Sequence, residues 1–384
     1  MNLFAYLFAL ALVASGQLPK APAQQARMDD GLLGRAAAIL EEQIRRGELG
    51  AASLFVARQG KTVLHQGWGK LSPAPQAGPV TPDSVFLVAS ITKPVTACAL
   101  MILVERGEVL LDDPVSRYLP EFTGDHRERV RVRDLLSHTS GLPDMLPENI
   151  ELRRAHAPLS RFVEGALKTP LLYVPREDFR YQSMGILLAG EIVERVAKMP
   201  LRDFMRREIF EPLGMKNTAL GMKPGWRLEQ LVRVFEPAHE DPADNLRFGP
   251  NSPYWRDMGH PWGGMHSTSS DLAVFLEAFL NGGRHQGRRW LSPATVSAMI
   301  RDQNEHLKKP WGLGWALAKS AVWMYAGELV SPQTFGHSGA TGTLAWADPV
   351  SKVICVILTN RPVSVDGGRT LRQVSNIVAA AVLD

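Results

Sequence analysis

A serine and a lysine three residues apart could together form an activated nucleophile. Ser90 and Lys93 follow an apolar, strand-like run over residues 85–89 and precede an apolar run at helical spacing over residues 95–105. Residues i and i+3 share one face of a helix, so the Lys93 amine is expected beside the Ser90 hydroxyl. A serine hydroxyl needs a neighbouring base, and a lysine can be that base if its surroundings lower its pKa. The helix N-terminus would also direct backbone N–H groups at a developing oxyanion. Taken alone, this short pattern favours an N-cap serine and a surface lysine.

Tyr181 could supply a proton relay for such a nucleophile. It stands shortly before an apolar run at helical spacing over residues 184–187. A tyrosinate or a hydrogen-bonded tyrosine near Lys93 could pass on the proton of Ser90 and later activate the water that releases an acyl group. The alternative is a tyrosine that packs at the start of a helix.

A glycine-rich stretch over residues 335–342, Phe-Gly-His-Ser-Gly-Ala-Thr-Gly, is the third chemical element. A strand edge with Gly339 would admit a substrate backbone, and a backbone N–H there could complete an oxyanion hole with that of Ser90. The stretch also nearly matches the nucleophile elbow G-x-S-x-G around Ser338. That motif requires an acid and then a histidine later in the chain. No histidine follows His337, so the elbow hypothesis fails.

Strand-like and helical patterns divide the chain into three parts. Strands are predicted near both ends, beginning with a hairpin, and helices are predicted mainly in the middle from the 3.6-residue period. The expected strands are 52–58, 62–68, 314–318, 344–347 and 352–360, and the expected helices are 31–46, 95–105, 132–138, 159–167, 184–196, 201–209 and 369–382. The most economical topology joins the terminal strands into one antiparallel sheet, with the helical part inserted between them.

The polar, proline-rich segment 237–262 is predicted to be a long loop that acts as a functional lid. Its Trp255 and Trp262 either line the active site or pack in the interior. The remaining conspicuous residues are predicted to be structural, with hydrogen-bonded histidines at His138 and His266 and core or sheet-edge tryptophans at Trp311 and Trp315.

The N-terminus has the pattern of an export signal. Residues 2–14 are almost wholly apolar but too few to span a bilayer comfortably, and an A-x-A sequence that ends at Ala23 offers a cleavage site. We therefore predict a signal peptide over residues 1–23 and a periplasmic or secreted mature chain without a membrane span. Because no Lys or Arg precedes the apolar run, an uncleaved N-terminal anchor is the alternative. Cys98 and Cys355 lie in apolar runs and are predicted to be two buried thiols, although one disulfide is possible in an oxidising compartment.

Composition and motif content exclude other classes of protein. The chain has 384 residues, 45% of them hydrophobic, which is typical of a globular enzyme. Its 43 Lys and Arg residues barely exceed its 39 Asp and Glu residues and are scattered, so no nucleic-acid partner is predicted. The sequence has no HExxH or Walker-type motif and its histidines are dispersed, so neither a metal nor an organic cofactor is predicted. The expected partner is a small-molecule ester or amide, and no oligomeric state is predicted.

The three chemical elements occur in an order that resembles the serine β-lactamase-related family, which includes class C β-lactamases, family VIII carboxylesterases and D-aminopeptidases. Further family-like stretches are Leu-Leu-Ser-His-Thr-Ser-Gly-Leu-Pro over residues 135–143, Glu-Pro-Leu-Gly-Met over residues 211–215 and Gly-Gly-Met-His-Ser-Thr over residues 263–268. The resemblance extends from about residue 30 to the C-terminus.

This resemblance implies an α+β fold of the β-lactamase/transpeptidase type over residues 30–384. An antiparallel sheet would be flanked by helices, with an inserted, mainly helical lobe over residues 96–290 and the active site between the two parts. The resemblance further implies that Ser90 is the nucleophile and that Lys93 and Tyr181 transfer its proton. The oxyanion hole would consist of the backbone N–H groups of Ser90 and Ala340.

Two departures from the family pattern affect the expected substrate. Ser183 stands where the family usually has the asparagine of Tyr-x-Asn, so it could still bond Lys93 but would hold an acylamino side chain less well. His337, Ser338 and Gly339 stand where β-lactamases have Lys-Thr-Gly, and a histidine is mostly neutral near pH 7. These substrate-binding positions therefore favour carboxylic esters or neutral amides. The alternatives are β-lactamase or D-amino-acid peptidase activity, and a non-catalytic scaffold with the same fold.

Overall fold

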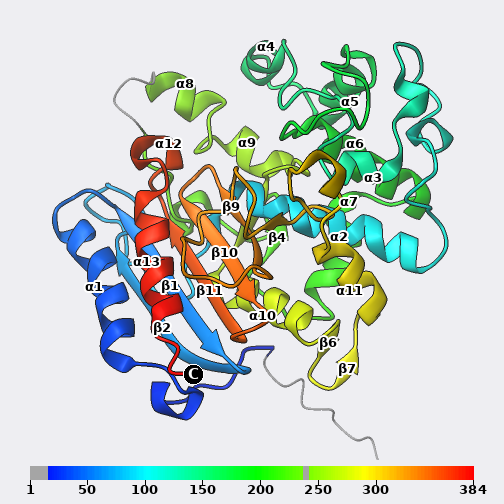
Figure 1. The fold of residues 1–384 in the computed structure, drawn as a ribbon. Coiled ribbons are helices and arrows are strands. Elements are labelled where there is room, and N and C mark those ends of the chain that lie inside the picture. The colour runs from blue at the N-terminus through cyan, green and yellow to red at the C-terminus, as the bar shows by residue number, and fades with distance from the viewer. Residues whose placement is uncertain (1–15, 237–241) are drawn as a thin grey trace, which may run out of the picture.

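The protein is described by a computed structural model that covers residues 16–236 and 242–384. A six-stranded antiparallel sheet forms its centre (Figure 1). The strands, in spatial order, are β2 (Lys61–Gly69), β1 (Ala51–Arg58), β11 (Val353–Thr359), β10 (Thr343–Asp348), β9 (Phe335–Gly339) and β8 (Ala316–Leu317). The prediction that strands from the two ends of the chain share one antiparallel sheet is therefore confirmed.

Both faces of this sheet are covered by helices. Helices α1 (Asp30–Arg45) and α13 (Arg369–Ala380) lie side by side on one face, and α10 (Ser269–Leu280) lies on the other (Figure 1). Successive side chains of a strand point to opposite faces, so Leu54 of β1 joins the core beneath α1 and α13, whereas Phe55 joins the larger core on the other side. Burial on both faces explains why β1 is apolar without alternation.

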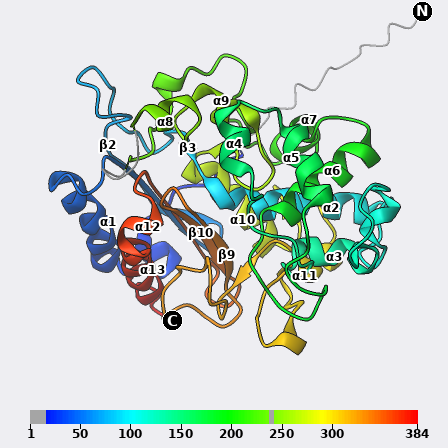
Figure 2. The same cartoon turned by 90° about the horizontal axis from the view of Figure 1, so that it is seen from above.

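The helical part lies beside the sheet, with α2 packed against α6 at its centre (Figure 2). Its helices are α2 (Thr92–Glu105), α3 (Val132–Leu136), α4 (Asn149–Arg154), α5 (Leu159–Lys168), α6 (Met184–Ala197), α7 (Leu201–Met205), α8 (Pro242–Arg247), α9 (Pro253–Met258) and α11 (Pro293–Ile300). Short strands are β3 (Phe86–Leu87), β4 (Ala219–Leu220) and β5 (Met265–Ser267) in one sheet and β6 (Arg284–His285) with β7 (Arg288–Arg289) in another, and α12 (Val363–Asp366) precedes α13. The arrangement has the predicted α+β class. The bounds 96–290 of the helical lobe stay a prediction, because α10 lies within them but packs on the sheet.

The segment 237–262 is not the long loop that the sequence predicted. Residues 237–241 lie outside the described residues, but the remainder contains α8 and α9. Helix α9 begins with a local signal, because the Ser252 hydroxyl accepts a hydrogen bond from the Trp255 N–H and a proline follows at the first helical position. Trp255 and Trp262 are 8% and 3% exposed, so they pack in the interior and do not form an open wall.

The apolar residues 2–14 of the predicted export signal lie outside the described residues, but its predicted end at Ala23 lies within them. The Ala21 N–H donates to the Thr62 carbonyl of β2, and Ala23 is buried. Cleavage after Ala23 would therefore remove a segment that pairs with the edge of the sheet. In the described part of the chain, no helix has both the length and the hydrophobicity to cross a membrane. Cys98 and Cys355 are buried and unpaired, as predicted.

Candidate functional site

Ser90 lies in a short 3₁₀ turn, Ala89–Ile91, that connects β3 to α2. Ala89 has a φ of 47°, a left-handed conformation that costs a non-glycine residue free energy and that surrounding contacts must hold. One such contact comes from the Thr92 hydroxyl, which donates to the Ala89 carbonyl at 2.7 Å. Another comes from Thr343 of β10, whose hydroxyl donates to the Val88 carbonyl at 2.9 Å. The turn that presents Ser90 is thus fixed by both α2 and the sheet.

Lys93 lies in the first turn of α2 and faces Ser90. Its Nζ is 3.1 Å from the Ser90 Oγ and donates a hydrogen bond of 2.9 Å to the Trp262 carbonyl. The side chain is almost fully buried, and this burial lowers the pKa of Lys93 from 10.5 to about 7, although the charge of Asp144 acts in the opposite direction. The ammonium and the free amine are therefore both populated near neutral pH.

Tyr181 precedes α6 and lies against the Lys93 side chain. The Lys93 Nζ is 4.7 Å from the centroid of the Tyr181 ring. The ring is partly exposed, but its hydroxyl is buried and has no partner of good hydrogen-bond geometry among the described residues. Burial raises the pKa of Tyr181 well above 10, while the Ser90 side chain lowers it by less. The group at this position is therefore a neutral phenol, which removes the tyrosinate alternative near neutral pH.

Ser183 does not bond Lys93, which the sequence left open. Its hydroxyl donates instead to the Asp144 carboxylate at 2.6 Å, and its N–H donates to the Asp144 carbonyl at 3.3 Å. Asp144 is exposed, yet its charge reaches Lys93. The sequence analysis did not identify Asp144 as a site residue. Its position directly after the family-like stretch 135–143 was the feature of the sequence that could have pointed to it.

The strand β9 brings the predicted His337, Ser338 and Gly339 beside the Ser90 turn. Gly339 packs so closely against the carbonyl of Val88 that a side chain could not fit there. Ala340 follows at the end of the strand and is exposed, and its N–H has no acceptor within the described part of the chain. Ala340 thus directly follows the end of β9, and β9 packs against the Ser90 turn.

His337 is a neutral imidazole in this environment. Its Nδ1 donates to the Ser338 carbonyl at 2.6 Å, which assigns the proton to Nδ1 and leaves Nε2 as an acceptor. Burial and the charge of Lys93 lower the pKa of His337 to about 3. Its Nε2 has no hydrogen-bond partner in residues 16–236 and 242–384. The ring is therefore unable to offer a positive charge to a substrate near pH 7.

The residues predicted to be structural make the expected contacts. His138 accepts a hydrogen bond from the Gln182 N–H, and His266 bonds the Gly221 carbonyl. Trp311 and Trp315 are 0% and 1% exposed, so both belong to the interior. Trp311 and His138 also pack against Tyr181, with ring centroids 5.9 Å and 4.7 Å away, and so they help to hold its orientation.

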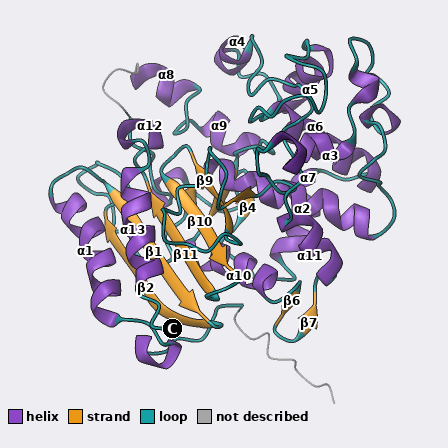
Figure 3. Cartoon of the chain, in the orientation of Figure 1, coloured by secondary structure: helices purple, strands orange, loops and turns teal. Residues whose placement is uncertain are grey.

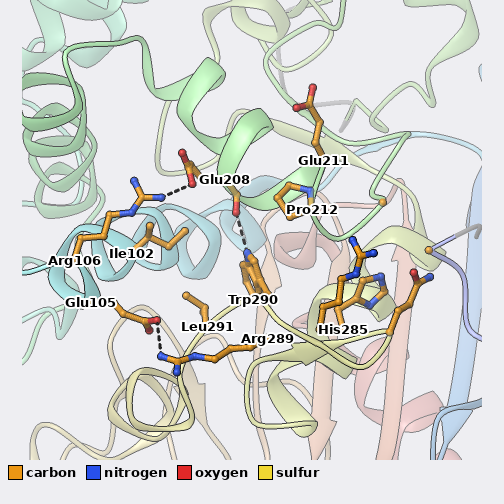
Figure 4. A pocket seen from close by; sticks show the side chains of 14 residues that line it. Ile102, Glu105, Arg106, Glu208, Glu211, Pro212, His285, Arg289, Trp290 and Leu291 are labelled. Atoms are coloured by element: carbon orange, nitrogen blue, oxygen red, sulfur yellow. Dashed lines mark hydrogen bonds and ion pairs between the residues drawn. The ribbon is translucent and has the colours of Figure 1, made fainter. Parts of the chain in front are cut away.

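A cavity of 640 Å³ lies at the opposite end of α2, beside Glu105 and Arg106 (Figure 4). With 1.5 Å of rise per residue, this end is roughly 20 Å from Ser90. Two ion pairs line it, one between Arg106 and Glu208 at 2.5 Å and one between Arg289 and Glu105 at 3.3 Å. The cavity is thus separate from the residues that the sequence predicted to be catalytic.

Acidic, histidine and cysteine side chains are the groups that most often hold metal ions in proteins. In the ranges 16–236 and 242–384, no group of three or more of them is placed to hold a metal ion. The polar groups around Ser90 are instead donors and acceptors suited to proton transfer.

Comparisons with known proteins agree with this arrangement. The model of the beta-lactamase family matches residues 36–379. A putative D-alanyl-D-alanine carboxypeptidase from Salmonella gallinarum is 31% identical over 370 residues, which cover 88% of this chain and 84% of the relative. Among solved structures, EstCE1, a hydrolase with promiscuous acyltransferase activity, has a TM-score of 0.74 at 23% identity and covers 93% of this chain and 99% of its own. A D-amino acid amidase from Ochrobactrum anthropi has a TM-score of 0.70 at 23% identity and covers 92% of this chain and 98% of its own. Because these two structures are distant in sequence, they show the shared fold alone. The chain belongs to the beta-lactamase family and, like its members, is a serine hydrolase.

Proposed function

We infer that the protein hydrolyses carboxylic esters through an acyl-enzyme on Ser90. The observation that carries this proposal is the pair formed by Ser90 and Lys93, with 3.1 Å between Oγ and Nζ and a Lys93 pKa of about 7. A neutral amine at this distance can accept the Ser90 proton through its lone pair while it donates to the Trp262 carbonyl. In this proposal, Lys93 is the general base of acylation.

The remaining steps use the groups around this pair. The Ser90 oxygen attacks the ester carbonyl, and its proton passes to the Lys93 amine. Negative charge on the former carbonyl oxygen would be stabilised by the backbone N–H groups of Ser90 and Ala340. The Tyr181 hydroxyl would protonate the leaving alkoxide and regain a proton from Lys93. Its buried hydroxyl supports this role, because it lacks a partner among the described residues and so remains free for a leaving-group oxygen.

Deacylation would reverse these transfers. Lys93, again neutral, would take a proton from water through Tyr181, and the resulting hydroxide would attack the acyl group on Ser90. The two side chains lie against each other, with the Lys93 Nζ 4.7 Å from the centroid of the Tyr181 ring, so the proposal places both next to the acyl group on Ser90. The acyl-enzyme would then release a carboxylic acid and restore the starting protonation states.

A second candidate function is favoured by the exposed carboxylate of Asp144. This charge lies close enough to Lys93 to influence its pKa, and Ser183 fixes its orientation at 2.6 Å. A carboxylate at the edge of the site would attract the ammonium group of a substrate, as in an amino-acid amide or ester. The Ochrobactrum anthropi protein of the same fold is a D-amino acid amidase by name. The second candidate is therefore hydrolysis of D-aminoacyl amides.

The decisive experiment replaces the nucleophile. Ser90→Ala is expected to lower hydrolysis of p-nitrophenyl butyrate by at least about a thousandfold and to abolish labelling by a fluorophosphonate probe. Ser72→Ala, in a loop away from the site, is the matched control and should keep both signals. Full activity in a folded Ser90→Ala protein would refute the proposal, and a wild-type chain that is folded but never labelled would favour the scaffold alternative.

Substrate class is tested by a comparison within one preparation. Rates on short-chain esters, D-aminoacyl amides and nitrocefin should rank in that order if the ester function is correct. A higher kcat/KM on D-aminoacyl amides would favour the second candidate, and dominant nitrocefin turnover would replace both with a β-lactamase function. The proposed periplasmic or secreted location is tested separately, by fractionation of cells that express the full chain.

A further inference from the structure

The outer edge of β9 next to Ser338 is occupied by another part of the chain. On the other side of β9, Ser338 pairs with Leu344 of β10, and β8 pairs with β9 only at Phe335 and Gly336. The outer edge beyond residue 336 would therefore be open to a substrate if nothing else covered it. Instead, the Trp323 carbonyl accepts two hydrogen bonds from Ser338, one from its N–H at 3.0 Å and one from its hydroxyl at 2.8 Å.

The Trp323 side chain extends this cover over the catalytic groups. Its ring packs against that of Tyr181 in a tilted arrangement, with centroids 5.1 Å apart and 32° between the planes, and it is stacked at 24° on His337 with centroids 6.5 Å apart. Trp323 has a φ of 58°, which is unfavourable for a side chain of this size. The contacts with these two rings and the double hydrogen bond stabilise this conformation. Ser338 is 0% exposed as a result, whereas Ala340, two residues further, is exposed.

The groups that remain on this side of the site are rich in lone pairs. Both donors of Ser338 are used by the Trp323 carbonyl oxygen. The His337 ring is neutral and has Nε2 as a bare acceptor. Beside Ser183, the Asp144 carboxylate adds a negative charge whose influence reaches Lys93. A carboxylate on the leaving group would meet acceptors where it needs donors, and it would lose water without gaining hydrogen bonds.

We propose that Trp323 is a specificity-determining residue that excludes substrates with a carboxylate on the leaving group and admits neutral or amine-bearing leaving groups. This inference rests on the proposed acyl-enzyme function and specifies its substrate class. Strands rise about 3.3 Å per residue, so Ser338 lies within roughly 7 Å of Ala340, at the distance expected of a leaving-group substituent. Trp323 thus acts at the site by occupying donors that a carboxylate would require.

The test compares two esters that form the same acyl-enzyme. Phenyl butyrate and 3-carboxyphenyl butyrate share their acyl group, so the ratio of their kcat/KM values at pH 8 reports leaving-group recognition in acylation alone. Trp323→Ala keeps the backbone carbonyl but removes the ring whose packing on Tyr181 holds residue 323 at its φ of 58°. The carbonyl should therefore leave Ser338, and the ratio is expected to move toward the carboxylated ester by about tenfold or more. Trp323→Phe keeps an aromatic ring to stack on Tyr181 and should keep the wild-type ratio. Val322→Ala, at the adjacent exposed position, is the control for unspecific effects on the loop.

A double variant tests the route of the effect. If Trp323→Ala frees the donors of Ser338, then adding Ser338→Ala should restore much of the wild-type ratio. Ser338→Ala alone should change the ratio little, because its hydroxyl is bonded to Trp323 in the wild-type protein. Trp323→Leu provides a second truncation in case the alanine variant does not fold, as judged by its thermal melting.

The outcomes separate this inference from the proposed function. An unchanged ratio in a folded and active Trp323→Ala or Trp323→Leu enzyme would overturn the role of Trp323 and leave the ester function intact. A gain that persists in the Ser338 double variant would also overturn it, because the donors would then not be the cause. A wild-type enzyme that hydrolyses neither ester would overturn the proposed function, and this inference with it.

Discussion

Replacing Lys93 with methionine should inactivate the protein and stabilise it, with a stabilisation that depends on pH. Lys93 is 1% exposed, and its burial holds its pKa at about 7 against an ordinary value of 10.5. Between these two values the unfolded chain binds more protons than the folded protein. The unfolding free energy of the wild-type protein therefore rises with pH from 7 to 10.5, and it falls again as the pH is lowered toward 7, because the unfolded state then takes up a proton that the folded state does not.

The size of the effect follows from protonation linkage. A lysine with a pKa of 10.5 when unfolded and about 7 when folded costs about 4 kcal/mol of folding free energy at pH 7 and about 1 kcal/mol at pH 10. Lys93→Met removes this cost but also loses hydrogen bonds to Ser90 and the Trp262 carbonyl, worth about 1–2 kcal/mol together. The variant should be more stable by about 2–3 kcal/mol at pH 7 and nearly equal to wild type at pH 10.

Urea unfolding of both proteins at pH 7, 8, 9 and 10 measures this difference directly. Groups that titrate equally in the two proteins cancel, so the difference in unfolding free energy isolates Lys93. Lys309→Met, at an exposed lysine, is the matched control and should show a small difference at every pH. A difference for Lys93→Met that does not vary with pH would refute the reasoning, because Lys93 would then not titrate near 7.

Four further variants test other groups of the site and the fold. Tyr181→Phe should lower kcat on p-nitrophenyl butyrate by about a hundredfold and change KM little, because the hydroxyl is lost while the packing of the ring remains. A large rise in KM alone would contradict the role of the hydroxyl in proton transfer. The acid limb of kcat/KM against pH should have its midpoint near 7 in the wild type. Asp144→Asn should move this midpoint down by about 0.5 pH unit, because the carboxylate raises the pKa of Lys93. An upward shift of the midpoint would contradict this effect of Asp144. Arg58→Ala should cost about 2–4 kcal/mol in urea unfolding, since the buried guanidinium pairs with Asp384 at 2.8 Å and bonds three backbone carbonyls. Arg27→Ala, which removes a more exposed partner of Asp384, should cost under about 1 kcal/mol, and equal losses for the two arginines would count against the role of burial.

The catalytic pair was accessible from the sequence because its geometry is local. Ser90 and Lys93 are three residues apart on one helical turn, so helical periodicity alone places their side chains together. The sheet was accessible for a related reason, since β1 and β11 are long apolar strands between turn residues. The 3₁₀ turn at Ala89–Ile91 was not, because a left-handed alanine has no sequence signature and depends on contacts from α2 and β10.

The residues that sequence reasoning missed reach the site through tertiary contacts. Asp144 lies in a loop and becomes relevant only because Ser183 bonds it and Lys93 lies near it. Trp323 lies in a loop without periodicity, and only the folded chain shows its carbonyl on Ser338. The segment 237–262 was misjudged because its prolines suggested a loop, whereas Pro253 begins α9 after its Ser252 cap. Loop residues of this kind set specificity, so substrate class was the least accessible property.

Burial gives the site its common chemical character. It lowers the pKa of Lys93 to about 7 and that of His337 to about 3, and it raises that of Tyr181 well above 10. All three groups can therefore be uncharged near neutral pH, which gives the site an amine that can accept a proton and a phenol that can donate one. Asp144 is exposed, and the negative charge of its carboxylate acts on Lys93. A site arranged in this way has little with which to attract an anionic substrate, and the same burial that activates Ser90 thereby limits what Ser90 can attack.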